Sequence, residues 1–146
     1  MIGVVVVTHG QLATELVNAA ETIVGDLPRF AAVSIGWHED VHDARDEIQA
    51  AIGRVRSGAG GVLIITDMFG GTPCNLAMTF LAKDDVEVVT GVNLPMLIKA
   101  ASLRETGGLG DVARQLAEHG RSAIWVASDL LEGTSPSGTG TTPAQG

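Results

Sequence analysis

The sequence is poor in residues on which several classes of protein depend. Cys74 is the one cysteine among 146 residues, so no internal disulfide forms, which is typical of a reducing compartment. Two tryptophans, three phenylalanines and no tyrosine leave little material for the platforms on which nucleic-acid bases stack. The chain therefore lacks the aromatic signature of a protein that binds single-stranded nucleic acid.

Basic residues are also scarce. Nine Lys and Arg residues stand against 17 Asp and Glu residues, which gives a formal net charge of -8. Nucleic acids and anionic membranes bind basic patches, so neither is an expected partner. The negative charge suits a basic protein partner instead.

Long apolar runs are absent as well. No run comes near the roughly 18 residues that a transmembrane helix needs. The chain begins without the basic segment of a signal peptide, and its first run of valines is short. We therefore expect a cytoplasmic protein without direct membrane insertion.

The composition changes once along the chain. The apolar content of 45% is enough for the core of one domain of this length. Residues 133–146, GTSPSGTGTTPAQG, instead contain no charge and almost no apolar bulk, which is typical of a flexible tail. We predict one domain over residues 1–130 and a flexible tail over residues 131–146.

Strand and helix patterns alternate within the domain. Short runs rich in β-branched residues predict strands at 2–7, 30–35, 61–66, 86–90 and 122–127. Apolar stripes at helical spacing predict helices between them. Their expected caps are Thr8 with Gln11, then Asp40, Thr72 before a proline, and Asn93. This pattern predicts an α/β fold with an open, mainly parallel, doubly wound sheet, whose first four strands have the order 2-1-3-4.

His9 and Asp67 each follow a predicted strand. Ligands of open α/β sheets gather beyond the carboxyl ends of the strands, and in the expected order strands 1 and 3 are neighbours. The two residues should therefore meet in one crevice. A carboxylate can hold the N–H of one imidazole nitrogen and leave the other nitrogen free as a nucleophile.

Two helices should begin at the same crevice. One follows His9, and the other follows Gly70-Gly71 and begins near Thr72. Free backbone N–H groups at helix starts bind phosphate. An oriented imidazole beside such groups predicts covalent transfer of a phosphoryl group, and amide groups can stabilise that charge without a metal or a cofactor.

Three sequence blocks, VVVVTHG, IITDMFGGTPCN and GVNLPML, occur in the order typical of one family. With them, residues 2–130 resemble the mannose/fructose-family enzyme IIA domain of the bacterial sugar phosphotransferase system. The resemblance implies that His9 is the phosphohistidine, with HPr as donor and a separate enzyme IIB as acceptor, and that Asp67 orients His9. It also implies a homodimer that exchanges its last strand, here SAIWVA.

The same resemblance implies further site residues. Thr72 matches a residue near the phosphate, and Met68 and Phe69 match the pocket wall. The full set of expected phosphate- or partner-binding residues is Thr8, Met68, Phe69, Gly70, Gly71, Thr72, Asn93, Pro95 and Met96.

Other motifs favour other chemistries less well. Residues 38–42, HEDVH, formally match a zinc-peptidase signature, but a helix that begins after Asp40 leaves His38 outside it, and Trp37 and His38 fit the rim of the crevice instead. Cys74 near a helix start could be a reactive thiol, yet a small buried thiol is the simpler interpretation. A receiver domain would need an acidic pair after strand 1, where this chain has Thr8-His9-Gly10.

Two functions outside sugar transport remain open from the sequence. The domain could be a regulatory module whose phosphorylation state is sensed by a partner protein without any sugar transport. It could also be a scaffold in which His9 carries no chemistry.

Overall fold

The computed structural model describes residues 1–133, so most of the predicted tail, residues 134–146, lies outside the described part of the chain. The described elements are β1 (Gly3–His9), α1 (Leu12–Val24), β2 (Phe30–Ile35), α2 (Val41–Val55), β3 (Val62–Thr66), α3 (Gly71–Met78), β4 (Val86–Thr90), α4 (Leu94–Leu103), α5 (Leu109–Ser122) and α6 (Ala127–Leu131).

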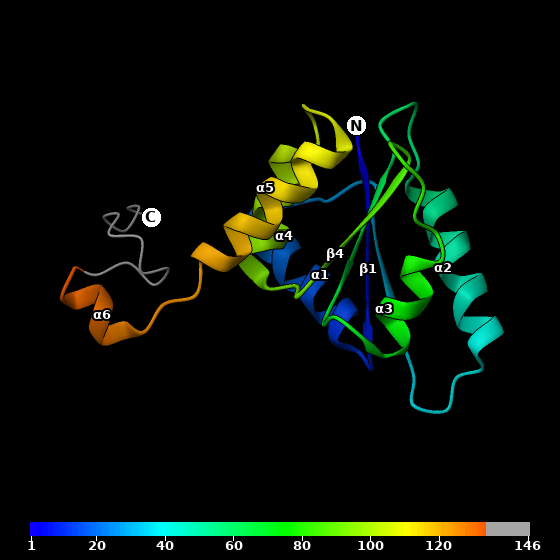
Figure 1. Cartoon of the computed structure of the whole chain (residues 1–146), viewed down its shortest axis with the longest axis horizontal. Coiled ribbons are helices and arrows are strands. Elements are labelled where there is room, and N and C mark those ends of the chain that lie inside the picture. Colours follow the sequence, from blue (N-terminus) through cyan, green and yellow to red (C-terminus); the bar gives the residue numbers. More distant parts are fainter. Residues whose placement is uncertain (134–146) are drawn as a thin grey trace.

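Four parallel strands form one open sheet in the order β2-β1-β3-β4, which confirms the predicted topology. Figure 1 shows α2 and α3 on one face of this sheet and α1, α4 and α5 on the other. β1 and β3 are paired neighbours in which Val7 lies opposite Thr66. Their carboxyl ends therefore meet at one edge of the sheet, where His9 and Asp67 follow.

The core lies on both faces of β1. Val4 and Val6 pack with the layer of α1, α4 and α5, whereas Val5 and Val7 pack with the layer of α2 and α3. All four valines are fully buried. A continuous run of β-branched residues is what a central parallel strand requires, because it alternates between two apolar layers. The same burial fixes the position of the residues at the end of the strand.

The starts of α2 and α4 match the sequence prediction. Asp40 accepts hydrogen bonds from the backbone N–H groups of His42 and Asp43, so α2 begins at Val41 and His38 lies before it. Asn93 accepts from the N–H of Met96 at the start of α4. Within residues 1–133, no group of three or more His, Cys, Asp or Glu side chains is arranged to hold a metal ion.

Two other predicted caps are wrong. β1 continues through Thr8 to His9, so the N-cap residue of α1 is Gln11 and not Thr8, although the Thr8 hydroxyl accepts from the N–H of Ala13 in the first turn of the helix. α3 is capped by Gly70 rather than Thr72, and it ends at Met78 instead of near residue 82. In both places the strand-to-helix turn is set by glycine backbone conformations.

The predicted fifth strand is not part of this sheet. Residues up to Ser122 belong to α5, the following four have no regular structure, and α6 stands apart from the body of the molecule (Figure 1). Ile124 and Val126 are exposed over 65% and 60% of their surface in the single chain. A strand exchanged with a second copy stays a prediction.

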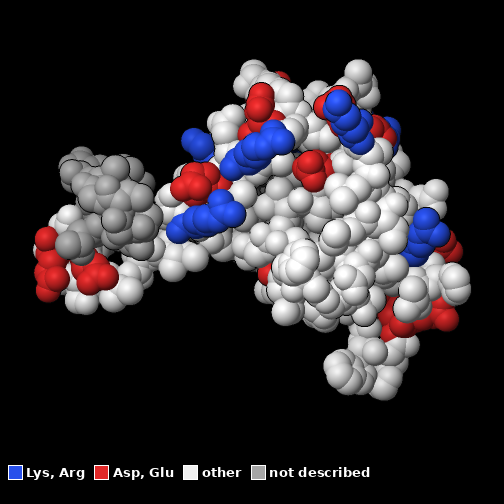
Figure 2. Space-filling view, viewed as in Figure 1, with Lys and Arg blue, Asp and Glu red and all other residues white. Residues whose placement is uncertain are grey.

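Among the described residues, no helix is both long and apolar enough to cross a membrane. On the face shown in Figure 2, Lys and Arg side chains lie singly or beside acidic ones rather than in one basic patch.

Candidate functional site

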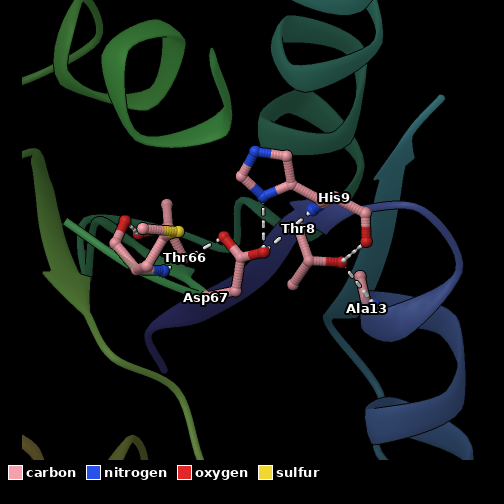
Figure 3. A network of polar contacts seen from close by, with 6 residues as sticks. Thr8, His9, Ala13, Thr66 and Asp67 are labelled. Carbon is pink, nitrogen blue, oxygen red and sulfur yellow. Dashed lines mark hydrogen bonds and ion pairs between the residues drawn. The ribbon is translucent and has the colours of Figure 1, made fainter. Parts of the chain in front are cut away.

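His9 and Asp67 are in direct contact at the carboxyl edge of the sheet. Nδ1 of His9 lies 2.7 Å from Oδ2 of Asp67, and the backbone N–H of His9 donates to the same oxygen at 3.0 Å. Figure 3 shows the imidazole above the carboxylate with its second nitrogen pointing away from it. Because an ionised carboxylate accepts hydrogen bonds but cannot donate them, Nδ1 carries the proton and Nε2 keeps its lone pair. The site therefore presents a nucleophilic nitrogen of fixed orientation.

Asp67 is itself held in place by the backbone. Its second oxygen, Oδ1, accepts from the N–H of Met68 at 3.0 Å. Burial of this side chain raises the pKa of Asp67, but hydrogen bonds from the His9 ring and from backbone N–H groups outweigh burial, so that its pKa is lowered overall. The carboxylate is consequently ionised at neutral pH and can stabilise positive charge on the imidazole.

Thr8 positions the turn that follows His9. It is fully buried, its hydroxyl donates to the His9 carbonyl at 3.2 Å, and the hydroxyl oxygen accepts from the N–H of Ala13 at 2.6 Å. The backbone N–H of Gly10 donates to the carbonyl of Ile35, which ties the same turn to the end of β2. Since its hydroxyl is engaged within the fold, Thr8 acts here on the backbone around His9.

The start of α3 lies against the free nitrogen of His9. A Cβ atom added to Gly71 would come within 3.3 Å of Nε2 and 3.2 Å of Cε1 of His9. Glycine at this position thus lets the backbone approach the ring, and its positive φ of 81° suits glycine as well. The first N–H groups of a helix have no intrahelical acceptor. The start of α3 therefore lies beside the His9 ring, where the sequence places a helix start.

A hollow of about 400 Å³ opens on the β2 side of His9. It lies between the ends of β1 and β2 and the starts of α2 and α3, and its lining residues are His9, Gly10, Ile35, Gly36, Trp37, Glu39, Val41 and Thr72. The expected rim residue Trp37 lines this hollow, whereas His38 does not.

Glu39 was missed by sequence reasoning. A signal for it existed, because Glu39 follows β2 within four residues and the ends of parallel strands share an edge. The HEDVH motif that contains Glu39 instead suggested a zinc site.

The other expected site residues fall into two groups. Met68 and Phe69 are 54% and 75% exposed beside Asp67, which is compatible with contact to a partner. Asn93 and Met96 instead join α4 to α5, because Asn93 donates to the Gly120 carbonyl and a Cβ on Gly120 would overlap the end of Met96. Pro95 lies in the first turn of α4.

Cys74 does not face the hollow. It is fully buried in α3, and its thiol contacts the sulfur of Met78 at 3.7 Å. This is the packing of a small apolar side chain.

Comparison with known proteins identifies the family of the chain. The family model described as PTS system fructose IIA component, where PTS denotes the phosphotransferase system, matches residues 3–117. The chain belongs to this family. The resemblance to mannose/fructose-family enzyme IIA domains is thereby confirmed, and the chain is a sugar-specific phosphotransfer component of the PTS type.

Individual PTS proteins show the same likeness. The chain is 32% identical to the PTS system fructose-specific EIIA component of Bacillus subtilis over 133 residues, which cover 90% of each protein. It is 30% identical to the mannose-specific EIIAB component of Escherichia coli over 84% of this chain, and it spans 38% of that longer protein. The mannose/sorbose-specific IIA subunit of Enterococcus faecalis superposes with a TM-score of 0.76 at 29% identity, over 86% of this chain and 93% of that subunit.

Proposed function

We propose that this PTS IIA component is a phosphohistidine carrier that takes a phosphoryl group from HPr and passes it to a separate enzyme IIB during sugar uptake in the cytoplasm. The observation that carries the proposal is the 2.7 Å contact between Nδ1 of His9 and Asp67, which leaves Nε2 free beside the start of α3. The family, rather than any contact in this chain, indicates HPr as the donor and enzyme IIB as the acceptor.

The proposed step is an exchange of one bond to phosphorus. The lone pair of His9 Nε2 attacks the phosphorus atom of the phosphorylated donor, and the bond from that atom to the donor nitrogen breaks with its electron pair. The Nδ1 proton stays between His9 and Asp67, whose negative charge stabilises the positive imidazole that forms. Backbone N–H groups at Gly71 and Thr72 stabilise the charge on the phosphoryl oxygens. Transfer to enzyme IIB is the same step in reverse, with a new acceptor.

Intact mass after incubation with phosphoenolpyruvate, enzyme I and HPr tests this proposal. We expect the mass of one phosphoryl group, labile in acid, on the native chain and none on His9→Ala. Because the His9 side chain is about half exposed, this variant should fold. His42→Ala, which removes an exposed histidine at the start of α2, is the matched control and should be labelled normally.

Labelling of His9→Ala would disprove the assignment of the nucleophile. If the native chain is phosphorylated but passes its phosphoryl group to no enzyme IIB, the regulatory alternative is favoured. In that alternative a partner protein senses the phosphorylation state.

We also propose a homodimer. β4 is an edge strand, and a hollow of about 270 Å³ lies between β4 and α5. The exposed apolar side chains of Ile124 and Val126 lie in an extended segment that a second copy could pair with this edge. Sedimentation should give a dimer mass for the native chain and a monomer for Val126→Asp; a native monomer would contradict the exchange.

A further inference from the structure

The last turn of α5 is held by a side chain from the start of α4. The side-chain N–H of Asn93 donates to the backbone carbonyl of Gly120 at 3.0 Å. This carbonyl is one of the last four of α5, which lack a donor four residues further along the helix. It also accepts from the N–H of Ala123, the first residue after the helix, at 3.4 Å. The point at which the chain leaves α5 is therefore fixed from outside that helix.

The side chain at position 93 combines two tasks. Oδ1 of Asn93 accepts from the N–H of Met96 at 3.1 Å and caps α4, while Nδ2 donates to Gly120. Serine, threonine and aspartate also cap helices, but an ionised aspartate cannot donate, and a hydroxyl is a single oxygen on a shorter side chain. Asparagine is therefore the residue that a cap needs if the same side chain is also to hold a neighbouring helix.

Gly120 lets the last turn of α5 lie directly on the start of α4. A Cβ atom added there would come within 2.8 Å of Cε of Met96 and 3.6 Å of Oδ1 of Asn93. The start of α4 is in turn anchored to the sheet, because the N–H of Val92 donates to the carbonyl of Thr66 at the end of β3 at 3.0 Å. The end of α5 thus has a fixed position relative to the sheet.

The chain leaves the body of the molecule directly after this point. Residues 123–126 belong to no helix or strand, and they lead to α6, which stands apart from the sheet and its helices (Figure 1). Ile124 and Val126 in this segment are largely exposed. An extended apolar segment that projects from a fixed helix end can pair with an unpaired strand edge, and β4 of a second copy offers such an edge.

A fixed exit direction favours this pairing. Each residue that becomes ordered when two copies associate loses conformational entropy, so a segment that already points toward its place loses less. Two-fold symmetry makes the demand twice, since the segment of each copy must reach the edge of the other. Without the link from Asn93, the last turn of α5 can fray in the monomer but must keep its direction in the dimer. Loss of the link should therefore weaken the dimer more than it destabilises the single chain.

We propose that Asn93 is a positioning residue for self-association, which fixes the direction in which residues 123–126 leave the domain and so sets how tightly two copies exchange this segment. The inference rests on the homodimer proposed above. It assigns the side chain of Asn93 to the contact between copies rather than to the phosphoryl group at His9.

Sedimentation velocity over a range of protein concentrations tests this role through the dissociation constant of the dimer. Asn93→Ser keeps an oxygen that caps α4 but is too short to reach Gly120, so we expect the dissociation constant to rise about tenfold, equivalent to about 1.4 kcal/mol. Asn93→Asp also keeps the cap and cannot donate, and it should weaken the dimer at least as much. Asn18→Ser is the matched control, because it makes the same substitution at an exposed position of α1, and it should change the constant less than about twofold.

The fluorescence of Trp125, which lies in the segment itself, separates positioning from stability. In the full chain with Trp37→Phe and Val126→Asp, Trp125 is the one remaining tryptophan and the protein is expected to be monomeric. Adding Asn93→Ser should lower the anisotropy of Trp125 emission, because the segment becomes more mobile, whereas adding Asn18→Ser should not. The melting temperature of this monomer should fall by less than about 4 °C, since a frayed last turn leaves the core in place.

The other outcomes count against the proposal or against its premise. Equal dissociation constants for Asn93→Ser and Asn18→Ser would overturn the role of Asn93. A weaker dimer with unchanged Trp125 anisotropy would also overturn it, because the link would then support stability without directing the segment. A native chain that stays monomeric at every concentration would instead refute the homodimer on which the inference rests.

Discussion

The four parallel strands begin at one side of the sheet, here called the amino edge, and end at the opposite side, the carboxyl edge. These two sides differ in how closely the backbone is packed. At the amino edge, a Cβ on Gly3 would overlap the Val55 carbonyl oxygen, and one on Gly61 would come within 2.8 Å of the Asp85 carbonyl oxygen. At the carboxyl edge, Gly10 and Gly36 have no atom within 4 Å of such a Cβ. One edge is therefore closed by backbone contacts, and the other is open to solvent and to partners.

Polar interactions follow the same division. At the amino edge, Arg56 and Asp85 form a bidentate ion pair that joins the end of α2 to the turn before β4. At the carboxyl edge, the His9–Asp67 pair leaves one ring nitrogen free beside a hollow. Close packing and a structural ion pair thus lie at the amino edge, whereas the carboxyl edge keeps open space and a free ring nitrogen.

The largest expected effect on stability is at the amino edge. Gly3→Ala forces a methyl group into the backbone of α2, which cannot move without disturbing the core, so we expect a loss of about 3 kcal/mol or failure to fold. Urea unfolding measures the change. A loss below about 1 kcal/mol would show that this edge is not closely packed, and the comparison would fail.

A smaller, pH-dependent effect is expected at Asp67. Asp67→Asn replaces a charge-assisted hydrogen bond by a neutral one and should cost about 1 to 2 kcal/mol at pH 7. Because the pKa of Asp67 is lowered in the folded state, its contribution is fully present above its ordinary pKa of 3.8 and is lost as pH falls through the lower folded value.

Unfolding of both proteins between pH 7 and pH 3 checks this sign. The difference in free energy of unfolding between native chain and Asp67→Asn should shrink as pH falls below about 4. A difference that widens below pH 4 would mean that the Asp67 carboxyl group is bound better in its protonated form. The variant should also slow phosphoryl transfer at pH 7.

The smallest effect is expected at the open edge. Gly36→Ala adds a methyl group in free space at an ordinary φ, so stability should change by no more than about 0.5 kcal/mol, or increase slightly. Gly10→Ala serves as the comparison, since its positive φ of 55° should cost about 1 to 2 kcal/mol without any clash. Equal losses at Gly36 and Gly3 would remove the distinction between the edges.

Much of the fold could be predicted because its signals are local. The valine run before His9, the apolar stripe of α2 and the caps Asp40 and Asn93 each depend on neighbours in the sequence. The meeting of His9 and Asp67 followed from one more step, since parallel strands end at a common edge. The turns were predicted less well. Thr8 is not the N-cap residue of α1, because burial of β1 extends the strand to His9, but its hydroxyl still accepts from the N–H of Ala13 in the first turn of that helix.

By itself, the sequence determined the order of the four strands and of the helices up to α5, the family, and the pair His9 and Asp67. These depend on residue type, on spacing and on the rule that parallel strands share an edge. The tertiary structure alone decided the hollow that joins Trp37 and Glu39 to His9, and the backbone contacts that require glycine at positions 3 and 61. Such features are distances between segments far apart in the sequence, and these distances exist only once the layers have packed.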